Sequence, residues 1–197
     1  SVEAQAECRF LLLAPNNLLK PSDGEPVTVP TQDMILGIYY LTLEKDGEPG
    51  EGKIFMDENE ARLAYDNHVI TLHSKIKVRK TLTNADGTTE SQIVDTTAGR
   101  IIFNEIIPQD LGFVDRKDPE NRFKYEIDFL VTKKELGKII NKCIHKHPST
   151  ETCVVLDNIK SLGYKYSTIA ALTVSVSDMV IPPEKETYIE EAGAEVA

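Results

Sequence analysis

Two cysteines and two histidines lie close together in the second half of the chain and could bind a metal ion or form a nucleophile with its base. They are Cys143, His145, His147 and Cys153. Zinc needs four sulfur or nitrogen ligands that converge in a tetrahedron. In the helix predicted here, His145 points away from the face that Cys143 and His147 share. A Cys–His nucleophile also needs a residue that orients its base, and none is evident. We therefore predict neither a metal site nor a catalytic residue in this cluster.

A second candidate is the polar pair Gln32 and Asp33, which follows a proline and precedes an apolar run that ends at Thr42. In one interpretation the two residues merely cap a buried helix or strand, which is the commoner use of such residues. In the other they stand at the start of a helix with a rigid apolar stem and face a functional site. The residue types alone favour capping.

The apolar run behind this pair has an ambiguous pattern. Thr31 is a plausible N-cap, with Asp33 in the first helical turn. Met34, Ile38 and Leu41 have helical spacing, whereas the β-branched and aromatic residues around them favour a strand. Both structures therefore stay open.

Three basic residues alternate with apolar ones in a stretch that is typical of a half-buried strand. Lys75, Lys77 and Arg79 would share the outer face of a strand over residues 70–79, on which His73 would also be solvated. Such a row could contact the phosphates of a nucleic acid, although it is more often a solvated strand face. No glycine-rich phosphate-binding loop accompanies it.

Helices and strands of several kinds must position these residues. Ser1 can cap a helix that Pro15 ends, residues 27–29 are β-like, and Asp57 begins a short helix. A turn at residues 84–87 would let residues 91–94 pair back on the basic strand as a hairpin. Residues 101–107 form a short apolar element.

The second half of the chain predicts two helices in a hairpin. Thr132 and Glu135 have the spacing of a capping box, and the helix behind them carries the best apolar stripe of the chain. Pro148 ends it, and the next helix would stop at Gly163. Residues 172–176 alternate as a closing strand. We thus predict an α+β fold of mixed helices and short antiparallel strands, with an αα-hairpin in the C-terminal half.

Composition limits the class of protein. The 197 residues carry a net charge of −10, so general electrostatic attraction to nucleic acid is excluded. No apolar run reaches the length of a membrane span. The 3 cysteines are few and odd in number, which indicates a reducing, cytoplasmic location. The chain starts without methionine and ends in a polar helix-like segment, which suggests an excised fragment.

Several motifs, in one order, resemble the largest catalytic subunit (beta-prime) of bacterial RNA polymerase. The resemblance runs from Ser1 to about Glu186. Its motifs are Ser1-Val-Glu-Ala-Gln-Ala-Glu7, Pro15-Asn-Asn17, Val29-Pro-Thr-Gln-Asp33, Gly37-Ile-Tyr-Tyr-Leu-Thr42, Leu72-His-Ser-Lys-Ile-Lys-Val-Arg79, Thr97-Ala-Gly-Arg100, Leu156-Asp-Asn-Ile159, Gly163-Tyr-Lys-Tyr166 and Val176-Ser-Asp-Met-Val-Ile-Pro182.

The resemblance implies a pore, or secondary-channel, domain for NTP entry and for extrusion of the backtracked RNA 3′ end. It implies a mixed α+β core at residues 1–125, an αα-hairpin with a closing strand at 126–183, and the start of a rim helix at 184–197. Implied partners are the beta, alpha, omega and sigma subunits, DNA template, RNA, NTPs and secondary-channel transcription factors, and no membrane. The catalytic Mg²⁺ would be bound by aspartates that this sequence lacks. We therefore expect no cofactor, and no activity, in the isolated chain.

Single residues carry less of this resemblance. Asn16, Asn17, Gln32 and Asp33 match positions near the active-site floor and pore, where they would support the catalytic loop. Two aspartates match rim positions, Asp157 and Asp178. Ser161 departs from the aromatic residue found in members that bind a nucleotide alarmone at the rim, which puts that site in doubt.

Two other function classes remain open. One is an independent module that binds nucleic acid or protein through the basic strand face. The other is an unrelated metalloenzyme that uses Cys143 and Cys153.

Overall fold

The apolar run behind Gln32 and Asp33 is a helix, which settles the open choice between helix and strand. The computed structural model describes residues 1–83 and 88–196. Its elements are α1 (Val2–Glu7), η1 (Cys8–Leu12), η2 (Ala14–Asn16), α2 (Asp33–Thr42), β1 (Ile54–Phe55), α3 (Glu58–Asp66), β2 (Lys75–Thr83), β3 (Thr89–Thr97), α4 (Ala98–Ile106), η3 (Pro119–Asn121), α5 (Lys133–Lys146), α6 (Ser149–Ala170), η4 (Val176–Asp178) and α7 (Glu184–Val196). The predicted α+β class is confirmed.

Helix α2 lies at the centre of the larger apolar core, where Ile38 and Leu41 are fully buried. Three glycines allow its close packing. A Cβ atom on Gly37 would lie 1.8 Å from the carbonyl oxygen of Gly163 in α6, and one on Gly99 in α4 would lie 1.9 Å from that of Leu41. Because no side chain separates the backbones, α2 is fixed rigidly against both neighbouring helices.

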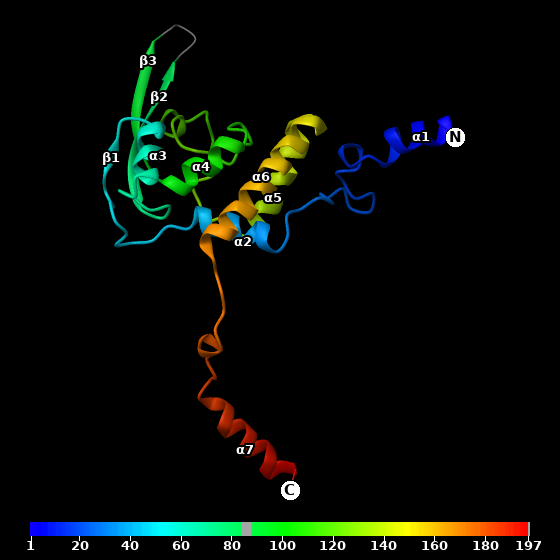
Figure 1. Ribbon diagram of the computed structural model, residues 1–197, viewed down its shortest axis with the longest axis vertical. Helices are drawn as coiled ribbons and strands as arrows, with labels where there is room; N and C mark the ends of the chain where they lie inside the picture. Colours follow the sequence, from blue (N-terminus) through cyan, green and yellow to red (C-terminus); the bar gives the residue numbers. More distant parts are fainter. Residues whose placement is uncertain (84–87, 197) are drawn as a thin grey trace.

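The predicted αα-hairpin is confirmed, and α5 and α6 lie side by side in Figure 1. The Thr132 hydroxyl accepts a hydrogen bond from the backbone N–H of Glu135 and so caps α5. The predicted end of the second helix at Gly163 is wrong, because α6 continues to Ala170. Gly163 is a contact point within the helix rather than its end.

The sheet is a three-stranded mixed sheet in which β1 pairs parallel and β3 antiparallel with β2. The predicted hairpin is confirmed over the register from Lys75 opposite Thr97 to Thr83 opposite Thr89. Its predicted turn, 84–87, lies outside the described residues. Ile76 and Val78 point into a second core cluster, together with side chains of α3 and α4.

The basic strand begins at Lys75, so its predicted start at residue 70 is wrong. The preceding residues form a turn in which the Ser74 hydroxyl donates to the carbonyl oxygen of Pro49, at 2.8 Å. The prediction of a solvated His73 is also wrong, since this side chain is buried against Tyr40. A turn does not keep the alternation of a strand, and His73 therefore points inward.

Three further predictions of local structure are corrected. Residues 27–29 and 172–176 are not strands, because no strand in the described part of the chain pairs with them. Thr31 does not cap α2, whose N-cap position is Gln32. Ser1 does cap α1, as predicted, through the backbone N–H of Ala4 at 3.2 Å.

Both terminal segments lie outside the body formed by the sheet and α2–α6 (Figure 1). Neither α1 nor α7 contains a buried residue. None of the helices in the part that the structure describes is both long and apolar enough to cross a membrane.

Candidate functional site

The polar pair at the start of α2 has an unusual backbone. Gln32 has φ 50° and ψ −123°, and its side chain makes no capping hydrogen bond. A positive φ is uncommon in a residue other than glycine and costs free energy. Gln32 and Asp33 are both exposed, whereas one face of the helix behind them, with Ile38 and Leu41, is buried. The side chain of Gln32 therefore does not cap the helix, and the pair projects from a rigid stem.

Asn16 and Asn17 have partners within their own segment. The Asn16 amide donates to the carbonyl oxygen of Phe10 at 3.1 Å, and the Asn17 amide donates to those of Leu11 at 2.6 Å and Leu13 at 3.1 Å. Carbonyl groups at the end of a helix lack intrahelical partners. The two asparagines therefore close the end of the first helical segment.

A mostly apolar pocket of about 380 Å³ lies between this segment and α6. Its lining includes Pro15, Met34 and Asp157, so it brings Asp157 next to the immediate neighbours of Asn16 and Asp33. Asp157 is exposed and pairs with Lys160 at 2.9 Å. Asp178 is not part of this pocket. Its carboxylate accepts from the backbone N–H of Ser175, at 2.8 Å, in the segment before α7.

The basic row on β2 lies next to carboxylates. Lys75 is 2.5 Å from Asp46, and this hydrogen bond raises the pKa of the Lys75 ammonium. Lys77 is 3.7 Å from Asp95, and Arg79 is exposed further along the strand. Exposed pairs of this kind contribute little stability. They do neutralise much of the charge that a phosphate backbone would meet. The basic row lies on β2, whereas Gln32 and Asp33 lie at the start of α2, so the two candidates belong to different elements.

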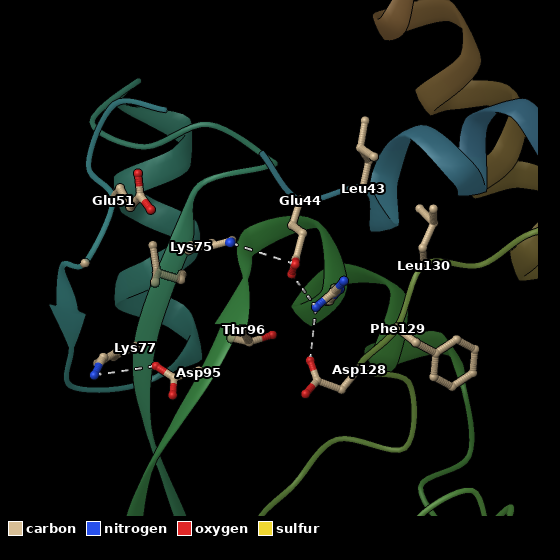
Figure 2. A pocket seen from close by; sticks show the side chains of 13 residues that line it. Leu43, Glu44, Glu51, Lys75, Lys77, Asp95, Thr96, Asp128, Phe129 and Leu130 are labelled. Atoms are coloured by element: carbon tan, nitrogen blue, oxygen red, sulfur yellow. Dashed lines mark hydrogen bonds and ion pairs between the residues drawn. The ribbon is translucent and has the colours of Figure 1, made fainter. Parts of the chain in front are cut away.

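A cavity of about 820 Å³ lies between the sheet and the chain around Phe129 (Figure 2). Arg100 is one of its lining residues, and the buried guanidinium of Arg100 is 2.9 Å from Glu44 and 3.3 Å from Asp128. Burial raises the pKa of Asp128, although Arg100 acts in the opposite direction. No local pattern in the sequence predicts this cavity, because its residues come from five separate stretches. In the sequence, Arg100 stands out only as part of the Thr97-Ala-Gly-Arg100 motif.

Cys143 and His145 lie in α5, His147 follows its last residue, and Cys153 lies in α6. Cys143 is buried, and burial raises the pKa of its thiol. His147 lies between Asp110 at 2.8 Å and Glu151 at 3.2 Å. Within residues 1–83 and 88–196, no group of three or more His, Cys, Asp or Glu side chains could hold a metal ion.

Comparisons with known proteins give one consistent result. The family model described as RNA polymerase Rpb1, domain 3, matches residues 17–179. The chain is 64% identical over 196 residues to the DNA-directed RNA polymerase subunit beta' of Lachnoclostridium phytofermentans, covering 100% of this chain and 16% of that subunit. Against the subunit beta' of Clostridium novyi it is 64% identical over 189 residues, 96% of this chain and 16% of that subunit.

The same subunit of Caldicellulosiruptor saccharolyticus is 61% identical over 196 residues, which cover 100% of this chain and 17% of the subunit. The chain thus spans only about a sixth of the length of these relatives. The resemblance drawn from the motifs is confirmed, and the chain belongs to the RNA polymerase Rpb1 domain 3 family.

Proposed function

We propose that this chain forms the pore, or secondary-channel, domain of a bacterial DNA-directed RNA polymerase beta' subunit. In that role it guides NTPs toward the active centre and accommodates the RNA 3′ end after backtracking. The beta, alpha, omega and sigma subunits would be its partners, with DNA, RNA and secondary-channel factors in the assembled enzyme. The Mg²⁺ for nucleotidyl transfer would be bound by aspartates outside this sequence, so the chain would support catalysis without performing it.

One structural observation supports this proposal most directly. Gln32 and Asp33 are exposed, yet Gln32 has a backbone conformation that costs free energy. The helix behind them is locked in place by the contacts of Gly37 and Gly99. A costly conformation on a rigid element, with polar side chains facing outward, is typical of a residue held for function rather than for stability.

The test uses polymerase assembled from full-length beta' and the other subunits, with Gln32→Ala and Asp33→Ala combined. Because positioning of reacting groups depends on small displacements, we expect elongation on a DNA template to slow by about tenfold. Lys133→Ala with Lys134→Ala is the matched control, since these residues are also an exposed pair at the start of a helix. Normal elongation by the Gln32 and Asp33 variant would show that the pair has no such role.

The alternative, an independent nucleic-acid-binding module, has less support. Its surface would be the row of Lys75, Lys77 and Arg79, and acidic side chains accompany the first two. Counterion release requires cations that can neutralise phosphates. Salt-dependent, micromolar binding of RNA or DNA by the isolated chain would favour this module over the pore domain.

A further inference from the structure

Four consecutive large apolar side chains stay in water at the end of the first helical segment. They are Phe10, Leu11, Leu12 and Leu13, each between 51% and 75% exposed. Single exposed apolar side chains are normal on a protein surface, whereas a contiguous group marks a site of contact. In Figure 1 this segment and α7 extend in different directions from the body, so the two exposed ends of the chain do not cover each other. The apolar run 10–13 therefore needs a partner from outside the described residues.

The backbone that carries this run is held in one shape by two asparagines. Cys8–Leu12 is a single turn of π-helix, a conformation that is rare and is frequent at functional sites. The Asn16 amide donates to the carbonyl oxygen of Phe10, and the Asn17 amide donates to those of Leu11 and Leu13. A surface whose shape is fixed before it meets its partner loses less conformational freedom on binding. The run is therefore preorganised for contact.

The size of the run indicates a partner in the same polypeptide. Four large side chains exposed to this degree supply on the order of 500 Å² of apolar surface. A stable interface between separate molecules buries about 800 Å² on each partner. A contact within one polypeptide needs less, because the two surfaces are held at a high effective concentration. This chain spans only 16% and 17% of the length of two beta' relatives, so most of such a subunit lies outside it.

We propose that the apolar run 10–13 docks into an apolar cleft formed by a part of the beta' subunit outside this chain. The four side chains enter the cleft, and Asn16 and Asn17 act as positioning residues that hold the run in its docking shape. The proposal rests on the proposed function only in making this chain a segment of beta', and not on the pore role. It adds an internal interface of the subunit, separate from the pair at the start of α2.

The partner is identified by photocrosslinking in polymerase assembled from full-length beta' and the other subunits. A benzoylphenylalanine replaces Leu12, an exposed residue of the run. We expect a crosslink to a peptide of beta' outside residues 1–197, located by mass spectrometry. In the Asn16→Ala, Asn17→Ala double variant the yield should fall about tenfold, since loss of these hydrogen bonds loosens the run. Asn67→Ala is the matched control, because the exposed Asn67 amide also donates to a carbonyl oxygen at a helix end, that of Leu63 at 2.8 Å.

A second measurement separates docking from folding. Asn16 and Asn17 are exposed and lie outside the body, so the double variant of the isolated chain should keep the urea midpoint of wild type. A lowered midpoint would assign the two asparagines to the stability of the body and overturn their positioning role. A crosslink confined to residues 1–197, to another subunit or to nucleic acid, or no crosslink at all, overturns the docking itself. Normal elongation by the Gln32 and Asp33 variant contradicts the pore role alone, so the two failures are distinguishable.

Discussion

At the scale of single residues, His73 shows how burial fixes a protonation state. Its Nδ1 lies 3.0 Å from the carbonyl oxygen of Leu43, which can only accept, so Nδ1 carries the proton. Nε2 is buried without a hydrogen-bond partner in the described part of the chain. Burial lowers the pKa of His73; the bond to Leu43 acts against this, Lys45 lowers the pKa further and Glu48 raises it. The folded chain therefore favours the neutral imidazole.

This protonation state predicts a dependence of stability on pH. The pKa of unfolded histidine is about 6.5, and that of folded His73 is lower. The unfolded chain thus binds the proton first, so stability is retained above that pH and is lost as pH falls through the folded pKa. We expect His73→Asn, whose amide can still donate to Leu43, to lose less stability between pH 7.5 and 5.5 than wild type. Urea unfolding at both pH values measures this, and equal losses would contradict it.

At the scale of elements, the contact between α2 and α6 depends on two glycines. A Cβ on Gly37 would lie 1.8 Å from the Gly163 carbonyl oxygen, and backbone atoms cannot move aside as a side chain can. We expect Gly37→Ala to destabilise the fold by about 3 kcal/mol, at the upper end of overpacking effects. Gly137→Ala is the matched control within α5, where nothing lies within 4 Å and alanine should stabilise by about 0.5–1 kcal/mol. Denaturant midpoints of the two variants should therefore move in opposite directions.

Sequence patterns predicted helices and strands well where residues a few positions apart determine them. They failed where a contact between distant parts of the chain determines the structure. The cap at Thr132 and the hairpin of β2 and β3 follow from spacing within a few residues. Gly163 suggested a helix end, because glycine is common there. The sequence does not show that the backbone of α2 packs directly against Gly163, which is the reason for glycine at this position. The cavity around Arg100 was beyond sequence reasoning for the same reason, since Glu44 and Asp128 reach it from distant stretches.

At the scale of the whole molecule, one folded body carries the stability. All described residues from 171 to 196 are exposed, whereas Gly163 and Tyr166 in the last turns of α6 are buried. Side chains that stay in water in the folded state contribute little to the free energy of unfolding. We therefore expect a chain that ends at residue 172 to have the same free energy of unfolding as the complete chain, within about 0.5 kcal/mol. Urea unfolding of both chains measures this, and their midpoints should coincide.

A second, deeper truncation is the comparison for this prediction, because it should lose stability. A chain that ends at residue 162 also loses Gly163 and the buried Tyr166, which belongs to the larger core cluster. Loss of a buried aromatic side chain and of the glycine contact with α2 should cost about 3–5 kcal/mol. If removal of the exposed tail alone lowered the midpoint as much as the deeper cut, then the tail would pack on the body in solution. The division into a stable body and an exposed C-terminal segment would then be wrong.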